Sequence, residues 1–121
     1  MEKYYASSHE WVMQVDERHV RVGISDYAQK ALGDIVFLST HEVSDSVSFG
    51  ERFGDVESVK AVSELLSPVD GVVSRVNTDL EDKPELLNED PLNIWIIEVE
   101  GQIDTTRLMR EEAYLALAKD H

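Results

Sequence analysis

The stretch Val56-Glu57-Ser58-Val59-Lys60-Ala61-Val62-Ser63-Glu64 lies within a longer run of strand-like residues, 53–66. This run exceeds the usual strand length of roughly 3 to 10 residues, yet it contains no Asn-Gly or Asp-Gly hairpin signal. Local propensity therefore places no turn in it. If the run folds back on itself, Lys60 is at the apex of the turn.

Lys60 has unusual neighbours for a lysine. Among the five lysines it alone is flanked by small or apolar residues, Val59 and Ala61, with Glu57 three residues before it and Glu64 four after it. Burial of an unpaired ammonium group is costly, whereas the neighbouring side chains favour burial. Two interpretations are open: an outward-facing lysine on a half-buried strand, or a lysine displayed at a tip and neutralised by acylation.

The rest of the chain predicts a mainly β domain with short helices. Turn-rich segments separate many short apolar stretches, a pattern typical of a β-sandwich or barrel. We expect one domain, 1–121, with its core at about 11–100. The predicted strands are 11–15, 19–24, 35–38, 72–76 and 94–99; the predicted helices are 26–32, capped by Ser25 and ended by Gly33, and about 104–118, capped by Asp104 with Leu108, Tyr114, Leu115 and Ala118 as its apolar stripe.

Composition narrows the classes of partner. The 121 residues include 25 acidic and 11 basic side chains, which gives a net charge of −14. Nucleic acid and anionic membrane would repel such a chain, so we expect neither as a partner. The chain contains no cysteine, and it shows neither a membrane-spanning stretch nor a signal peptide, so we expect a cytoplasmic protein.

No self-sufficient active site is visible in the sequence. The four histidines are dispersed without metal-ligand spacing, and neither a Gly-x-Ser-x-Gly elbow nor a glycine-rich phosphate loop is present. Carboxylate pairs carry little information in so acidic a chain. We therefore expect no catalytic residues, no metal site and no enzyme activity of the chain alone.

Several sequence blocks together resemble the H proteins of the glycine cleavage system, in collinear order over essentially the whole chain. The blocks are Ser8-His9-Glu10-Trp11-Val12, Val22-Gly23-Ile24-Ser25-Asp26-Tyr27-Ala28-Gln29, Leu32-Gly33-Asp34-Ile35-Val36-Phe37, Glu57-Ser58-Val59-Lys60-Ala61, Ser67-Pro68-Val69-Asp70-Gly71, Val76-Asn77, Pro84-Glu85-Leu86-Leu87-Asn88-Glu89-Asp90-Pro91 and Glu112-Ala113-Tyr114. Biotin carriers have methionine on both sides of the modified lysine, and 2-oxo acid dehydrogenase lipoyl domains have aspartate before it. Val59-Lys60-Ala61 is more similar to the H-protein motif.

The resemblance implies a barrel-sandwich hybrid fold, like that of lipoyl domains, with lipoate attached to Lys60 on a hairpin. It also implies a groove for the loaded arm, with Ser8, Glu10 and Glu64 at the matching positions. The implied function is a monomeric carrier that takes an aminomethyl group from a pyridoxal-phosphate glycine decarboxylase to a tetrahydrofolate-dependent aminomethyltransferase. Dihydrolipoyl dehydrogenase would reoxidise the carrier, and a lipoate ligase or lipoyl transferase would modify it.

Two alternatives remain at this stage: an H-like relay that donates lipoyl groups to other complexes, and a non-lipoylated interaction module with the same fold. The chain also departs from the family pattern. Segment 40–44 lacks the usual proline and glycine, segment 92–95 is one residue shorter and lacks glycine, and Tyr27 stands where histidine is common. Because glycine provides easy positive-φ positions, we expect these two loops to take a different path.

Overall fold

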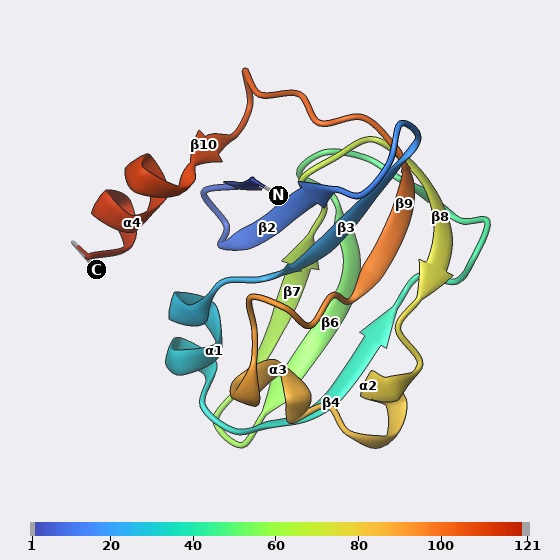
Figure 1. Cartoon of the computed structure of the whole chain (residues 1–121). Helices are drawn as coiled ribbons and strands as arrows, with labels where there is room; N and C mark the ends of the chain where they lie inside the picture. Colours follow the sequence, from blue (N-terminus) through green and yellow to red (C-terminus); the bar gives the residue numbers. More distant parts are fainter. Residues whose placement is uncertain (1, 120–121) are drawn as a thin grey trace.

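The apolar residues of the predicted strands form a core between two antiparallel sheets (Figure 1). The computed structural model describes residues 2–119. The larger sheet has the order β10 (Met109–Arg110), β1 (Lys3–Tyr5), β2 (Glu10–Gln14), β3 (His19–Ile24), β9 (Ile97–Gly101), β8 (Gly71–Val76) and β5 (Ser46–Val47). The smaller sheet has the order β4 (Ile35–Thr40), β6 (Arg52–Ser58) and β7 (Val62–Leu66).

Alternation along the strands explains which side chains enter the core. On β3, Val20 and Val22 are fully buried while Arg21 between them is partly exposed. On β6, Phe53 and Val56 are also fully buried in the core, because a register shift between Arg52 and Gly54 interrupts the alternation there. Side chains of a strand alternate between the two faces, so each sheet contributes one apolar face. This arrangement, with the terminal helix described below, is the predicted mainly β sandwich.

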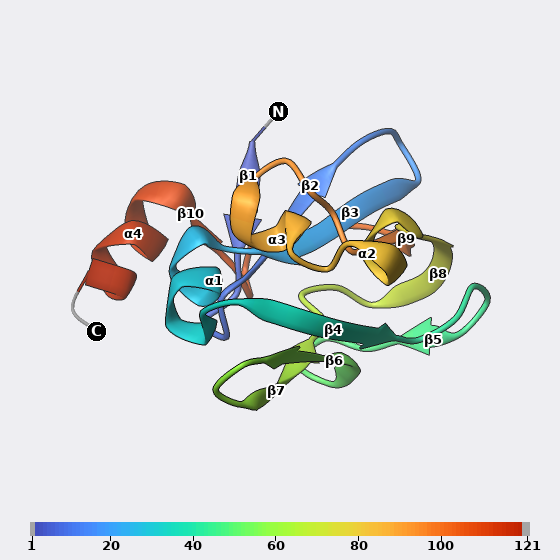
Figure 2. The same cartoon turned by 90° about the horizontal axis from the view of Figure 1, so that it is seen from below.

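The predicted run 53–66 does fold back on itself. Strands β6 and β7 pair antiparallel, with Glu57 opposite Val62 and Asp55 opposite Glu64. Figure 2 shows this hairpin in the layer below the larger sheet, with its tip next to helix α1 (Asp26–Leu32). Strand β7 ends the smaller sheet, so within residues 2–119 no other strand covers its outer edge.

Two single-turn helices, α2 (Asp79–Asp82) and α3 (Leu86–Glu89), follow β8 and cover one end of the core with Leu80 and Leu87. Asn88 on α3 joins this region to the site described below. Its Oδ1 accepts a hydrogen bond from the Ile35 amide at 2.9 Å, and its Nδ2 donates to the Gly33 carbonyl at 2.9 Å.

The terminal helix differs from the prediction. Helix α4 spans Glu111–Lys119 and does not begin at Asp104. Asp104 instead accepts a hydrogen bond from the Thr106 amide at 3.0 Å in a turn, and the chain then pairs with β1 as β10. In the predicted stripe Tyr114 is fully buried, but Leu115 is 54% exposed. The prediction that Leu115 belongs to the buried apolar stripe of this helix is therefore wrong.

Strand boundaries also shift. The predicted strand 94–99 is observed as β9, which begins at Ile97, since residues 91–93 form a turn and residues 94–96 lead from it to the strand with a bend at Ile96. Strand β1 was not predicted. Within residues 2–119, no helix is both long and apolar enough to cross a membrane.

In the loop that lacks proline and glycine, Ser44 adopts a φ of 81°. This is the left-handed region, which glycine occupies most easily. A serine therefore provides the positive-φ position in this loop.

Candidate functional site

Lys60 lies at the apex of the β6–β7 hairpin and is exposed to solvent. The turn is held by the buried Ser58. The Ser58 amide donates to the Ala61 carbonyl at 2.8 Å, and the Ser58 hydroxyl accepts from the Lys60 and Ala61 amides, each at 3.2 Å. A hydroxyl that bonds to nearby backbone amides stabilises a turn without glycine. This explains how the sequence Val59-Lys60-Ala61 can form a compact tip.

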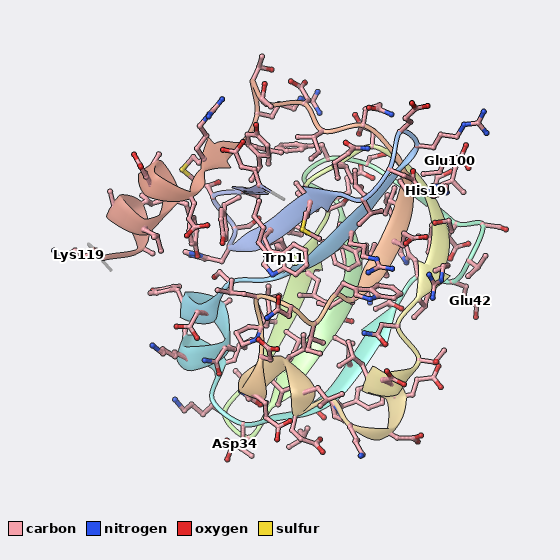
Figure 3. All side chains as sticks on the ribbon, in the orientation of Figure 1. Trp11, His19, Asp34, Glu42, Glu100 and Lys119 are labelled. Carbon is pink, nitrogen blue, oxygen red and sulfur yellow. The ribbon has the colours of Figure 1, made fainter. Side chains whose placement is uncertain are left out.

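A second loop supports the tip from the side. The amide of Val59 donates to the carbonyl of Asp34 at 3.0 Å. Asp34 is labelled at the lower end of the molecule in Figure 3, where the loop between α1 and β4 meets the hairpin. The lysine is thus presented from a backbone that is fixed on two sides.

Gly33 forms the surface against which the lysine stem lies. A Cβ atom at Gly33 would be 3.2 Å from Cε of Lys60 and 3.5 Å from its Nζ. Gly33 also has a φ of 79° and a ψ of −156°, a conformation that is essentially restricted to glycine. The absence of a side chain at Gly33 therefore leaves room for the stem of Lys60 beside the end of α1.

A groove of about 180 Å³ lies between helix α1, the start of β2 and strand β7. Its walls are mostly apolar, with polar groups at the sides of β2 and β7. The lining residues are Ser8, His9, Glu10, Ile24, Tyr27, Ala28, Ala31, Leu32, Val56, Ser63, Glu64 and Leu65. Leu32 directly precedes Gly33, so the groove starts next to the lysine stem.

Glu10 is the buried carboxylate of this groove, with only 3% of its surface exposed. It accepts a hydrogen bond from the Ser8 hydroxyl, and its Oε2 accepts from the Leu66 amide at 3.1 Å. Burial raises the pKa of the Glu10 carboxyl to about 7, and the hydrogen bonds from Ser8 and Leu66 partly offset this effect. A cation in the groove would favour the ionised form.

The structure brings together three of the four residues singled out in the sequence. Ser8, Glu10 and Glu64 all line the groove, and Lys60 is adjacent to it through Gly33. Ser8 and Glu10 are in direct contact. Glu64 is exposed on the edge strand, opposite Asp55. Glu10 is thus buried and hydrogen-bonded, whereas Glu64 is exposed to solvent.

Sequence reasoning missed the supporting roles of Ser58 and Gly33. Ser58 stands between Glu57 and Val59, and a single serine in such a run does not indicate a turn. Gly33 was interpreted only as the end of a helix, since its contact with Lys60 depends on tertiary structure.

Apolar side chains surround the lysine tip. Phe37 on β4, Val62 on β7 and Val59 in the turn are 58%, 64% and 67% exposed. Phe37 and Val62 both lie in register with Glu57, the strand residue between them. Large exposed apolar side chains that cluster are typical of contact surfaces.

Comparison with known proteins gives a consistent result. Residues 3–121 match the family model described as glycine cleavage H-protein. The glycine cleavage system H protein of Mycobacterium avium is 50% identical over 118 residues, covering 92% of this chain and 89% of that protein. The H protein of Clostridioides difficile is 47% identical over 116 residues, covering 93% and 91%.

A solved structure agrees over nearly the whole length. The crystal structure of a glycine cleavage system H protein from Mycobacterium marinum superposes with a TM-score of 0.90 at 34% identity, covering 98% of this chain and 97% of that one. The barrel-sandwich fold predicted from the sequence is thereby confirmed. Taken with the match to the family model and the identities above, this shows that the chain belongs to the glycine cleavage H-protein family.

Proposed function

We propose that Lys60 is the attachment site of a lipoyl group and that the chain is a carrier in the glycine cleavage system, working in the cytoplasm. The observation that supports this most directly is the exposed lysine on a rigid hairpin at the entrance of an apolar groove that contains a buried carboxylate. Family membership supports the same proposal.

The residues around Lys60 fit such a group. A lipoyl chain is apolar along most of its length, and Leu32, Ala31 and Ala28 provide apolar contacts along α1. Acylation converts the ammonium group to an uncharged amide, which removes the cost of placing the stem near apolar side chains. Ser58 and Gly33 hold the tip and leave space beside it.

When attached, the lipoyl group supplies a dithiol–disulfide couple that accepts and releases an aminomethyl group. The protein contributes presentation and binding. Glu10 provides a negative charge where a protonated amine would be held, and Ser8 fixes the direction of the carboxylate. The apolar walls limit the access of water to the groove.

The partners that we propose are glycine decarboxylase, the tetrahydrofolate-dependent aminomethyltransferase, dihydrolipoyl dehydrogenase, and a lipoate ligase or lipoyl transferase. The apolar side chains of Phe37, Val59 and Val62 would contact the enzymes that act at the tip. The net charge of −14 favours basic surfaces on those enzymes.

Incubation with lipoate ligase, lipoate and ATP tests the attachment site. The ligase joins the lipoate carboxyl to Nζ of Lys60 and converts ATP to AMP and pyrophosphate. We expect a mass increase of one lipoyl group in the native protein and in Lys30→Arg, a control on α1, but not in Lys60→Arg. Modification of Lys60→Arg, or none in the native protein, would contradict the proposal.

Reconstitution tests the carrier role. The lipoylated protein, mixed with glycine decarboxylase, should support glycine-dependent exchange of carbon dioxide. A relay that only donates lipoyl groups would be modified at Lys60 but would not support this exchange.

A further inference from the structure

The turn between β1 and β2 has an unusual residue at a demanding position. The Ala6 amide donates to the Glu10 carbonyl at 2.9 Å, and the His9 amide donates to the Ala6 carbonyl at 3.0 Å. His9 closes this turn with a φ of 80°. Glycine is favoured at such a position in hairpin loops, and a bulky residue there is strained. Strain of this kind persists only where surrounding contacts enforce it.

Contacts that hold His9 come from the C-terminal helix and from Tyr27 on α1, whose ring centroid is 4.6 Å from that of His9. Nδ1 of His9 and the hydroxyl of Tyr114 are 2.7 Å apart, and the two rings meet edge to face at 5.6 Å between centroids. The Tyr114 ring also stacks on Tyr5 of β1 at 4.3 Å. Helix α4 lies beside the amino-terminal hairpin in Figure 1. The contacts of Tyr114 with His9 and Tyr5 place its ring against the turn.

The same hydroxyl reaches helix α1. Tyr114 Oη and Ser25 Oγ are 2.6 Å apart. Ser25 is the N-cap of α1: its Oγ accepts from the Ala28 amide at 3.1 Å, and its own amide donates to the His9 carbonyl at 2.9 Å. A hydroxyl can donate one hydrogen bond and accept another, so Tyr114 can bond to His9 and Ser25 at once.

This junction is next to the polar end of the groove. Ser8 and Glu10, the two groove residues in direct contact, flank His9 in the sequence. We propose that the Tyr114 hydroxyl is a positioning group, which holds the turn between Ala6 and Glu10 against α1 and so fixes the Ser8–Glu10 pair in the groove.

The role in holding the loaded arm rests on the proposed function, but the positioning itself is a property of the unmodified protein. The Leu66 amide reports the place of the Glu10 carboxylate, because it donates to Oε2 of Glu10. Burial is also what raises the pKa of Glu10. If the Glu10 carboxylate leaves its place, the Leu66 amide should therefore exchange faster and the pKa of Glu10 should fall.

Tyr114→Phe removes the hydroxyl and keeps the ring that stacks on Tyr5. In the unmodified protein we expect hydrogen exchange of the Leu66 amide to become at least about fivefold faster, as for the loss of one hydrogen bond. The titration midpoint of Glu10, followed by carboxyl ¹³C NMR, should move down toward that of a solvated carboxyl. Of the titratable groups near Glu10, this variant retains His9, Tyr27 and Glu64 and removes the phenol of Tyr114.

His9→Gly breaks the same contact from the other side. Glycine adopts the positive φ without strain, so the turn should form while the link to Tyr114 is lost. We expect this variant to accelerate Leu66 exchange as well, and Tyr114→Phe to add no further acceleration in its background. The matched control is Tyr4→Phe, whose hydroxyl contacts Glu2 at the surface, and it should leave Leu66 exchange unchanged.

Unchanged Leu66 exchange and an unchanged Glu10 midpoint in Tyr114→Phe would overturn the inference. Additive effects of the two substitutions would overturn it too, because they would show that His9 and Tyr114 act separately. If Tyr114→Phe does not fold, His9→Gly alone tests the inference. An unchanged rate of Leu66 amide exchange in His9→Gly would then refute the positioning role of Tyr114.

The functional consequence is measured separately. In the lipoylated carrier loaded with an aminomethyl group, water hydrolyses the S-aminomethyl group to the free thiol, formaldehyde and ammonia. We expect Tyr114→Phe to release ammonia about fivefold faster than the native protein, because Glu10 is held less firmly. If Lys60 cannot be lipoylated, the carrier proposal fails, whereas the exchange measurements on unmodified protein still decide the role of Tyr114.

Discussion

Glu10 makes the stability of the unmodified protein depend on pH in a direction opposite to that of most carboxylates. Its pKa rises from an ordinary value of 4.5 to about 7 in the folded protein, chiefly through burial. The folded state therefore binds one more proton than the unfolded state between these two values. Stability must fall as the pH rises through this window, and it levels off above it.

The size of the effect follows from the two pKa values. Each pKa unit corresponds to about 1.4 kcal/mol, so the ionised carboxylate costs the folded protein about 3 kcal/mol at pH 8 relative to pH 4.5. Glu10→Gln removes the charge and keeps an acceptor for the Leu66 amide, while its NH2 group can donate to the Ser8 hydroxyl in place of accepting from it. We expect this variant to match the native protein near pH 4.5 and to be about 3 kcal/mol more stable at pH 8.

Urea unfolding from pH 4.5 to 8 at constant ionic strength measures this difference, because subtraction of the two variants removes the contribution of all other titrating groups. Glu112→Gln, at an exposed position on α4, shows how much of the difference comes from the loss of any single negative charge. A difference that is constant with pH would refute the reasoning. The reasoning would also be refuted if the native protein became more stable relative to Glu10→Gln as the pH rises.

Three further substitutions test the framework of the site. Ser58→Ala removes the acceptor for two amides of the tip, so we expect a loss of about 1 kcal/mol in urea unfolding and slower acylation of Lys60 by lipoate ligase; an unchanged acylation rate would contradict the role given to Ser58. Gly23→Ala places a Cβ against the Trp11 ring. Such overpacking should lower the free energy of unfolding by about 1–3 kcal/mol, measured by tryptophan fluorescence during unfolding. An equally stable variant would show that the ring can move aside. Asn88→Ala leaves the amide of β4 without its acceptor, so we expect about 2 kcal/mol of destabilisation and faster exchange of that amide, whereas unchanged exchange would show that another group replaces the asparagine.

The hairpin shows why sequence patterns alone could place the strands but not the turn. Turns are recognised from glycine or asparagine because these residues supply positive φ angles. Within residues 2–119, positive φ angles occur at His9, Ser44, Gly33 and Gly50, and none of these lies at the tip. The tip is closed by the Ser58 hydroxyl, so propensity carries no signal for it. The position of Lys60 at the apex was predicted only through the family resemblance.

The terminal helix shows a different limit. Asp104 is a good helix cap by composition, but its carboxylate caps a turn, and the next residues extend to pair with β1. An aspartate that accepts a hydrogen bond from an amide two residues later is equally suited to both structures. Pairing with a distant strand decided between them, and that pairing is not visible locally.

The link from Tyr114 to His9 spans 105 residues. Neither residue has a pattern around it that predicts the contact. The apolar stripe of the helix did predict that Tyr114 is buried, but the direction of its hydroxyl depends on the turn between β1 and β2. The groove residues Ser8 and Glu10 were predicted from the resemblance, and the contacts that hold them were not.

In the part of the chain that the structure describes, strand β7 leaves one edge of the smaller sheet without a partner strand. Such an edge invites a second molecule to add a strand and so begin aggregation. Here the Leu66 amide at the end of that edge is occupied by Glu10, and Glu64 places another carboxylate on the same strand. Two molecules that approached each other edge to edge would therefore bring carboxylates together. The Leu66 amide, which already donates to Glu10, could not donate to the second molecule. The groove that we assign to the arm thus also protects the free protein, before any arm is attached, from pairing with its own copies.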